Sequence, residues 1–214
     1  MRNKDTSLNE RILSYIEKLP YFTFDNLKIL DVPAHHLRIA LSRLEGRNKV
    51  IRLKRGFYIS TKFVEKAKTN GTFTSLIEFI STKLYPPSYL SLEYVLYENN
   101  ILTDVPVNFT LMTRNKTYTV RNNIGVFIYH KIKDNLFCGY RVEKSNGYFY
   151  FKAEKAKALF DFLYLRKKMI LNRKMAMELR LNLDVFSKGE IRNLENYIEM
   201  DGSKRMQEIF SYLF

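Results

Sequence analysis

Residues 33–60 have the sequence PAHHLRIALSRLEGRNKVIRLKRGFYIS, and this stretch decides the predicted fold of the N-terminal part. Its first half has apolar residues at helical spacing, and its second half has two strand-like runs joined by the turn Lys54-Arg55-Gly56. Pro33 suits the first turn of a helix, and Gly46 suits its end. The stretch therefore predicts one amphipathic helix followed by a two-stranded hairpin.

Two further helices are predicted before this stretch. The first begins at the capping box Ser7-Leu8-Asn9-Glu10, whose hydroxyl and carboxylate each accept a hydrogen bond from a backbone N–H, and Pro20 ends it. Thr23 is the predicted cap of the second helix. Three helices followed by a basic hairpin are the order of elements in a winged helix-turn-helix, and we predict this fold for residues 1–62.

The third helix has an apolar stripe along one side, formed by Leu37, Ala40, Leu41 and Leu44. Its other side is polar, as a helix in the DNA major groove requires. We therefore predict DNA contacts from this helix and the basic segment after it: His35, His36, Arg38, Ser42, Arg43, Arg47, Lys49, Arg52, Lys54 and Arg55.

These residues have different predicted roles. The predicted base contacts are Arg38, Ser42 and Arg43, with the two histidines near the entrance of the groove. The predicted contacts to phosphate or to the minor groove come from the wing, at Arg52, Lys54 and Arg55.

The charge balance agrees with a nucleic-acid partner. The chain has 36 Lys and Arg against 22 Asp and Glu, a formal charge of +14, and its pI is about 9.7. Charge alone fits a solvated basic face equally well. The order of the helices together with the basic hairpin favours double-stranded DNA, bound with a strong dependence on salt.

Other features of the sequence indicate the cellular compartment of the protein. The single cysteine, Cys138, excludes an intramolecular disulfide and fits a reducing compartment. The first residues, Met1 to Asp5, lack the apolar core of a signal peptide, and no stretch approaches the apolar length of a membrane span. We therefore expect a cytoplasmic protein without a membrane partner.

A second domain is predicted over residues 72–214, after a polar, Lys-rich bridge at residues 61–72. Short helices and a run of strands are predicted first, including a hairpin at Asn146-Gly147, and the helical period returns from Ala153. The predicted fold class is α+β: an N-terminal winged helix-turn-helix followed by a mixed α/β domain ending in a helical bundle.

Three motifs follow one another along the chain: Arg52-Leu53-Lys54-Arg55-Gly56-Phe57-Tyr58, then PSYLSLEYVL at residues 87–96, then AEKAKALFD at residues 153–161. Together they resemble the AbiEi-type antitoxins of bacterial abortive-infection, or type IV toxin–antitoxin, systems. The first is similar to the family's basic Arg-Gly-x-Tyr wing, and the second to its element of a tyrosine, a small residue and a helix. The third matches the family's Ala-x-Pro-Glu-Lys-Ala-Leu-x-Asp helix start at Lys157, Ala158, Leu159 and Asp161, but Lys155 and Ala156 replace its Pro-Glu.

The resemblance implies two roles in antiviral defence. The N-terminal domain would bind inverted repeats in the promoter of its own operon and repress transcription. The C-terminal domain would neutralise a toxin resembling nucleotidyltransferases, without a stable complex between the two proteins. A regulator unrelated to any toxin is the alternative.

Basic residues on or near two consecutive C-terminal helices form the predicted antitoxin surface: Lys155, Lys157, Arg166, Lys167, Lys168, Arg173 and Lys174. Such a patch can contact RNA, DNA phosphates or an acidic protein face. Ordinary solvated helix positions explain the same residues. Lys157 and Asp161 are also spaced for a helical ion pair, worth about a few tenths of a kcal/mol.

An enzyme is not predicted, and the sequence indicates no catalytic residues, cofactor or metal. His35 and His36 are adjacent on a helix, so their side chains are expected to diverge rather than share a metal. His130 and Cys138 lie in neighbouring strand-like segments, but a Cys–His pair needs a third, orienting group. Neither a phosphate-binding glycine loop nor a cluster of carboxylates is present in the sequence.

Two other binding functions are compatible with the sequence. The aromatic residues of the strand-like segments can stack single-stranded bases, which would indicate an RNA-binding protein: Tyr140, Tyr148, Phe149, Tyr150 and Phe151. A core role for alternate rings explains them as well. A winged helix that binds protein instead of DNA is the third possibility, but acidic residues that would favour it are missing from the third helix.

Overall fold

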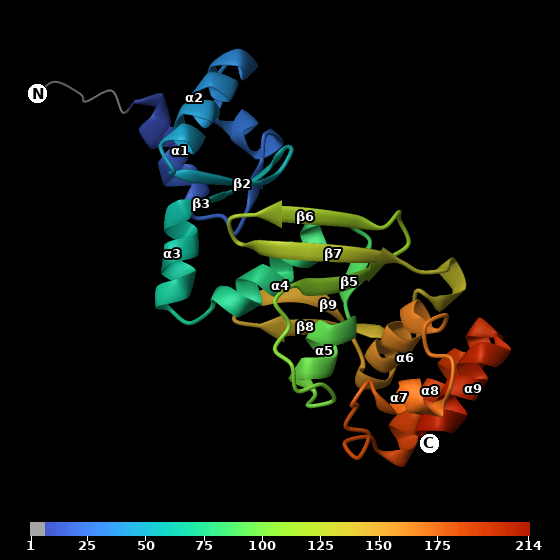
Figure 1. Cartoon of the computed structure of the whole chain (residues 1–214). Helices are drawn as coiled ribbons and strands as arrows, with labels where there is room; N and C mark the ends of the chain where they lie inside the picture. Colours follow the sequence, from blue (N-terminus) through green and yellow to red (C-terminus); the bar gives the residue numbers. More distant parts are fainter. Residues whose placement is uncertain (1–6) are drawn as a thin grey trace, which may run out of the picture. The chain divides into compact units, whose positions relative to one another are not determined.

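Helices and strands are mixed along residues 7–214, which are the residues that the computed structural model describes (Figure 1). About 48% of the chain is helical and 21% is in strands, which confirms the α+β class. The chain divides into two units. Unit 1 comprises the residues up to Ile80 together with Val120–Gly125, and unit 2 comprises Ser81–Thr119 and Val126–Phe214.

Unit 1 contains a three-stranded antiparallel sheet in the order β1-β3-β2. Its elements are α1 (Leu8–Ile16), β1 (Phe22–Thr23), the 3-10 helix η1 (Asp25–Leu30), α2 (Ala34–Gly46), β2 (Val50–Lys54), β3 (Phe57–Ser60), α3 (Thr61–Thr69) and the greater part of α4 (Phe73–Leu84).

The core of unit 1 lies between α1, α2 and the sheet. Ile12 and Ile16 from α1 are fully buried, together with Phe22 and Leu27. The predicted inner stripe of α2 is confirmed, since Leu37, Ala40, Leu41 and Leu44 are all buried in the same cluster. These contacts fix which side of α2 is left outside the core.

The capping box of α1 is also confirmed. The Ser7 hydroxyl accepts a hydrogen bond from the Glu10 backbone N–H at 3.3 Å. In return, the Glu10 carboxylate accepts one from the Ser7 N–H at 2.9 Å. Each bond satisfies an N–H that the helix itself leaves without a partner.

Two predictions about unit 1 are wrong. Thr23 does not cap a helix, because it belongs to β1 and its N–H donates to the Asn26 side chain at 2.7 Å. The helix that follows is a short 3-10 helix, η1, which ends at Asp31 in a left-handed conformation. Residues 61–69 form α3 rather than an open bridge, because Val64 and Ala67 provide a buried side for it.

Unit 2 contains most of a six-stranded sheet in the order β6-β7-β5-β4-β9-β8. Its strands are β4 (Ser88–Leu90), β5 (Phe109–Thr113), β6 (Tyr118–Asn122), β7 (Gly125–Lys131), β8 (Tyr140–Ser145) and β9 (Tyr148–Ala153). β4 pairs antiparallel with β5 and parallel with β9. Asn146 and Gly147, both with positive φ (50° and 82°), connect β8 to β9, as predicted for this hairpin.

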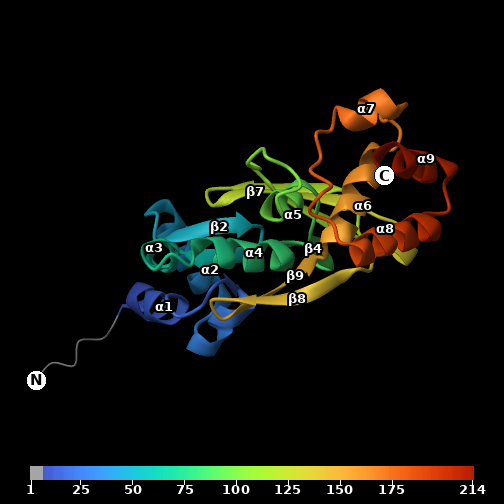
Figure 2. The same cartoon turned by 90° about the horizontal axis from the view of Figure 1, so that it is seen from below.

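The helices of unit 2 are α5 (Leu92–Glu98), α6 (Lys155–Arg166), α7 (Arg173–Met177), α8 (Lys188–Asp201) and α9 (Lys204–Leu213), with the 3-10 helix η2 (Asp134–Leu136) before β8. α6 follows β9 directly and packs against α5, α8 and α9. In both Figure 1 and Figure 2 the C-terminal helices α7, α8 and α9 gather with α6 at one end of the sheet. Ser187 caps α8 through a second capping box with Glu190.

Candidate nucleic-acid interface

The exposed side of α2 carries two neighbouring rows of side chains, at spacings of three and four residues. One row contains His35, Arg38 and Ser42, and the other contains His36, Ile39 and Arg43. All six side chains are exposed, opposite the buried stripe of the same helix. The structure therefore brings together, on α2, the residues that the sequence predicts to contact bases.

The two histidines do not diverge, which corrects the sequence prediction. Their ring centroids are 3.9 Å apart in the first turn of α2. The next residue of this row, Arg38, places its guanidinium 5.3 Å from the centre of the Phe24 ring. This contact orients Arg38 at the surface without an acidic partner.

The basic residues after α2 lie on its C-terminal end and on the β2–β3 hairpin. The exposed ones are Arg47, Lys49, Arg52 and Arg55. Lys54 is half-buried, its ammonium lies 5.9 Å from the centre of the Phe57 ring, and burial lowers its pKa below the ordinary value of 10.5. Gly56 turns the hairpin with a φ of 77°, a left-handed conformation that glycine adopts without steric cost.

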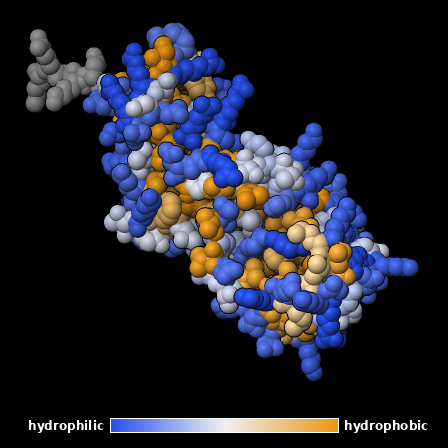
Figure 3. Space-filling model, in the orientation of Figure 1, coloured by the Kyte–Doolittle hydropathy of each residue, from blue (hydrophilic) through white to orange (hydrophobic). Residues whose placement is uncertain are grey.

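The exposed cations Arg47, Lys49, Arg52 and Arg55 form no ion pair within residues 7–214. Two ion pairs within unit 1 lie outside the predicted contacts and join Lys28 to Asp25 at 2.7 Å and Lys62 to Glu17 at 2.8 Å. Exposed cations that form no ion pair within this part of the chain are available to an anionic partner. In the view of Figure 3, hydrophilic side chains cover much of the surface around α1 and α2, with hydrophobic patches between them.

Ile39 is a candidate contact that the sequence reasoning missed. It lies between His36 and Arg43 in the second row and is 49% exposed, although it is apolar. The same row borders a hollow of about 290 Å³, closed on its other side by the start of α1 at Ser7 and Leu8. Helical spacing from the buried stripe was the available signal, because it assigns position 39 to the outer side.

The predicted antitoxin surface is only partly exposed. Lys168, Arg173 and Lys174 are exposed. Three other members join α6 and its C-terminal end to neighbouring elements through ion pairs: Lys155 with Glu190 at 2.9 Å, Arg166 with Glu93, and Lys167 with Asp201 at 2.8 Å.

Lys157 is not a surface residue, and its inclusion in the predicted surface is wrong. Its side chain is 0% exposed and its ammonium donates to the Asp161 carboxylate, which is equally buried. Asp161 also accepts hydrogen bonds from the hydroxyls of Tyr89 at 3.0 Å and Ser91 at 2.8 Å. We call Lys157, Asp161, Tyr89 and Ser91 the buried ionic network.

Aromatic rings surround the ammonium of this network. The Lys157 nitrogen lies 4.7, 5.6 and 5.8 Å from the ring centres of Phe160, Tyr197 and Tyr89. Burial raises the pKa of the Asp161 carboxyl, while Lys157 and the hydroxyl donors oppose this shift. A lysine at this depth is held by one full counter-charge and by the negative faces of the rings.

Close packing around the network reaches Gly139, which has a φ of 69°. A Cβ atom at this position would lie 2.3 Å from the Tyr197 hydroxyl and 2.9 Å from a side-chain carbon of Lys157. Glycine is therefore required here both for its backbone conformation and for space.

His130 and Cys138 do not form a pair across a hairpin. His130 is on β7, where it lies in register with Met112 of β5, whereas the strand after Cys138 is β8 at the far end of the sheet. Burial lowers the pKa of His130 and raises that of Cys138. Both shifts favour the neutral groups, as expected for residues that pack rather than react.

The aromatic residues of β8 and β9 have different environments. Tyr150 is buried, and Tyr140 stacks on Tyr89 with 4.6 Å between the ring centroids. Phe149 and Phe151 are exposed. Part of the predicted base-stacking set therefore belongs to the core of unit 2.

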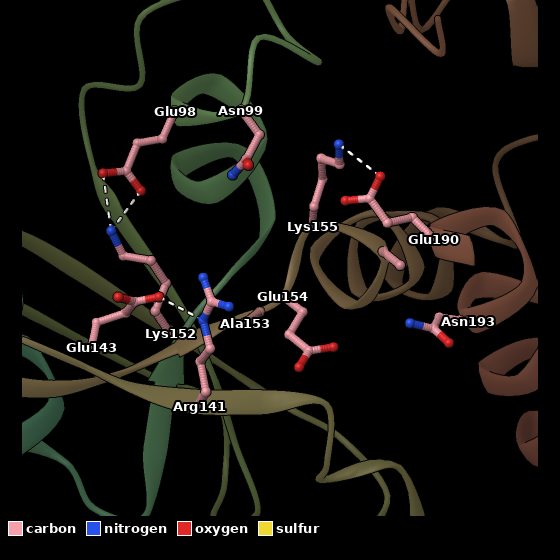
Figure 4. Close-up of a pocket in the computed structure, with 11 residues that line it drawn as sticks. Glu98, Asn99, Arg141, Glu143, Lys152, Ala153, Glu154, Lys155, Glu190 and Asn193 are labelled. Carbon is pink, nitrogen blue, oxygen red and sulfur yellow. Dashed lines mark hydrogen bonds and ion pairs between the residues drawn. The ribbon is translucent and has the colours of Figure 1, made fainter. Parts of the chain in front are cut away.

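A polar cleft of about 410 Å³ lies between β8, β9, α5 and the start of α6 and α8 (Figure 4). Its charged side chains are mostly paired with one another. Lys152 donates to both oxygens of Glu98, at 3.0 and 2.9 Å, and Arg141 donates to Glu143 at 2.7 Å. A ligand would have to displace these pairs, so the cleft is less suited to an anion than the exposed side of α2.

Within the part of the chain that the structure describes, no group of three or more His, Cys, Asp and Glu side chains is arranged to hold a metal ion. None of the helices in residues 7–214 combines the length and the apolar character that crossing a bilayer requires. No protein-family model matches the chain, and a search of curated proteins finds none similar to it.

Proposed function

We propose that unit 1 is a winged helix-turn-helix that binds double-stranded DNA, with α2 in the major groove and the β2–β3 hairpin as the wing, and that the protein is a transcriptional repressor. The observation that carries the proposal is the outer side of α2, where exposed polar and basic side chains continue into the exposed cations Arg47, Lys49, Arg52 and Arg55. A recognition helix presents its outer side in this way.

Each part of this surface has a proposed contact. Arg38 and Arg43 have the planar donors that pair with the O6 and N7 acceptors of guanine, and Ser42 can donate to or accept from either strand. Ile39 provides an apolar surface for a thymine methyl group between the two rows. The wing arginines, Arg52 and Arg55, contact phosphates or the minor groove.

The test is a gel-shift titration on the DNA upstream of the protein's own gene, compared with a scrambled duplex at two salt concentrations. We expect the upstream DNA to bind at least roughly a thousandfold more tightly, with a strong salt dependence on both duplexes. Equal, salt-sensitive binding to both duplexes would contradict a sequence-specific repressor and would favour the alternative function of an RNA-binding protein. The absence of binding to either would contradict the winged helix-turn-helix itself.

An antitoxin role for unit 2 is proposed from the resemblance to the AbiEi-type family. One observation supports it. Tyr89 and Ser91 from the second motif and Lys157 and Asp161 from the third meet in the buried ionic network, 70 to 72 residues apart in the sequence. The second and third motifs that carry the resemblance are thus parts of one structural unit.

Co-expression with the product of the neighbouring gene tests this role. We expect growth arrest by that product to be relieved by the full-length protein and equally by an Arg43→Ala variant, since α2 would not take part. Failure of both proteins to relieve the arrest would contradict the antitoxin role, and loss with Arg43→Ala alone would assign the protection to transcriptional repression.

A further inference from the structure

β8 is the last strand of the six-stranded sheet, so one of its edges has no neighbouring strand in the described chain. Its other edge pairs antiparallel with β9 along its whole length. The free edge is accessible, because Arg141, Val142 and Lys144 are all exposed. An open edge of this kind is a template for pairing with another strand.

The register with β9 shows which backbone groups of β8 face outward. The Glu154 N–H donates to the Gly139 carbonyl at 3.0 Å, one step beyond the ladder. In an antiparallel ladder, hydrogen-bonded pairs alternate with pairs that are not hydrogen-bonded. The N–H and C=O groups of Arg141 and Glu143 therefore point to β9, and those of Tyr140, Val142 and Lys144 point to the free edge.

The side chains of β8 are complementary to a second copy of the same strand. In an antiparallel pair centred on Val142, Arg141 lies opposite Glu143 of the second copy, and the two-fold axis repeats this pair. Shifting the pairing by one hydrogen-bonded step places Arg141 opposite Arg141, or Glu143 opposite Glu143. Opposite charges stabilise directly facing positions and like charges destabilise them, so the charges select the register centred on Val142.

The spacing of the two backbones favours the same register. Arg141 and Glu143 occupy the positions that are not hydrogen-bonded across the new interface, where facing residues are closest, with about 4.5 Å between Cα atoms. Arg141 already donates to Glu143 of its own strand at 2.7 Å, and Figure 4 shows both side chains on one side of β8. Pairing would close these four charges into a ring.

The other face of this hairpin supplies exposed apolar surface near the same edge. Val142 is 57% exposed, and Phe151, its partner in register on β9, is 39% exposed. Phe149, two residues earlier on the same face, is 53% exposed. A second copy of β8 would bring another Val142 beside this cluster and remove part of it from water.

We propose that two copies of this chain associate through antiparallel pairing of their β8 strands about Val142, which joins their sheets across a two-fold axis. An interface of this kind is isologous, with the same residues contributed by both copies. The strand is short, and the area buried falls below the roughly 1,600 Å² of a standard interface, so the association is weak and depends on concentration. This inference does not depend on DNA binding.

Sedimentation velocity over a concentration series tests the proposal. We expect a reversible monomer–dimer equilibrium for the natural sequence. Arg141→Glu and Glu143→Arg should each weaken the dimer at least tenfold, because each places like charges opposite one another. The double variant should restore the dimer, since it exchanges the positions of the charges and keeps every facing pair opposite in sign.

Two further variants serve as controls. Lys168→Glu changes the net charge as much as Arg141→Glu at an exposed position away from β8, and it should leave the dimer unchanged. Val142→Pro removes an N–H that points to the free edge, where proline is tolerated, so it should abolish the dimer while circular dichroism stays that of the folded protein. A monomer at all concentrations, or a double variant no better than the single ones, would overturn the proposal.

Discussion

α2 and the segment from α6 to Lys168 are both basic, but their cations have opposite environments. The exposed cations of α2 and of the segment after it form no ion pair among the described residues: Arg38, Arg43, Arg47, Lys49, Arg52 and Arg55. The cations of α6 are each matched by a carboxylate: Lys155 by Glu190, Lys157 by Asp161 and Arg166 by Glu93. The same residue types thus remain exposed in unit 1 and form internal connections in unit 2.

The difference comes from the acids that the fold places beside each helix. Glu93 is on α5 and Glu190 is at the start of α8, so two of the α6 pairs join this helix to elements far away in the sequence. α2 packs instead against apolar side chains of α1 and the sheet, and its exposed cations Arg38 and Arg43 form no ion pair with any acid in residues 7–214. A run of basic residues therefore indicates a binding surface only where the tertiary neighbours lack acids.

The strongest test of this comparison is the removal of Lys157 alone. Lys157→Met leaves the buried Asp161 carboxylate without its counter-charge, and we expect the free energy of unfolding to fall by about 3–5 kcal/mol. Denaturant unfolding measures the change. In the double variant Lys157→Met/Asp161→Leu part of the stability should return, since no charge remains buried, although the Tyr89 and Ser91 hydroxyls lose their acceptor. A loss for the single variant below about 0.5 kcal/mol would show that the network contributes little.

The corresponding change in α2 should affect binding and not stability. Arg43→Ala should weaken binding to the preferred DNA sequence by about 1–3 kcal/mol and relax the preference at one base pair. Lys54→Ala is the matched comparison, with a uniform loss on all sequences and a flatter salt dependence. Gel shifts on specific and random duplexes distinguish the two. Equal losses on both duplexes for Arg43→Ala would exclude it from base contact.

The contribution of the paired acids of unit 2 to stability can be tested at Asp201 by measuring unfolding as a function of pH. Burial tends to raise the pKa of this carboxyl, but hydrogen bonds from Lys167, Ser203 and Lys133 outweigh burial and hold the pKa below its ordinary value of 3.8. A depressed pKa contributes stability that is present above 3.8 and lost as the pH falls further. Asp201→Asn should therefore cost about 1 kcal/mol at neutral pH.

The difference between Asp201→Asn and the natural sequence should shrink as the pH falls below about 3.8, when the natural carboxylate also becomes neutral. Thermal or denaturant unfolding at several pH values follows this difference. A gap that stays constant down to the acid limit would mean that Asp201 acts through packing rather than through its charge.

The smallest effect is expected at Lys168, the exposed cation that follows the α6 pairs. Lys168→Ala should change the free energy of unfolding by less than about 0.5 kcal/mol, because this side chain is in water and has no ion pair within residues 7–214. Unfolding measured beside Lys157→Met compares an exposed and a buried lysine from the same basic run. Similar losses for the two would contradict the environments described above.

Local signals predicted much of the fold. The spacing of Leu37, Ala40, Leu41 and Leu44 fixed the buried side of α2, and the pair Asn146-Gly147 located a hairpin. The 3-10 character of η1 and the whole of α3 were missed, because short 3-10 helices and a half-apolar helix give weak periodic signals. The strand order β6-β7-β5-β4-β9-β8 is set by contacts between distant residues, which periodicity does not report.

For the candidate site too, local signals in the sequence were predictive and contacts between distant residues were not. Exposure of Arg38, Ser42 and Arg43 follows from the α2 stripe, because the opposite side of an amphipathic helix faces water. The burial of Lys157 was not predictable from its neighbours. The sequence shows Asp161 four residues after Lys157, at the spacing of a helical ion pair. The hydroxyls of Tyr89 and Ser91, which donate to the Asp161 carboxylate, are 72 and 70 residues away from it in the sequence.

The enclosed ammonium of Lys157 also has a consequence for chemical reactivity. An amine reacts with acylating reagents only when the reagent reaches it, and the aromatic shell and the carboxylate of Asp161 block this approach while unit 2 is folded around Lys157. Acylation of exposed lysines such as Lys168 needs no opening. The rate at which Lys157 is acylated, followed by mass spectrometry, therefore reports how often unit 2 unfolds locally around this residue.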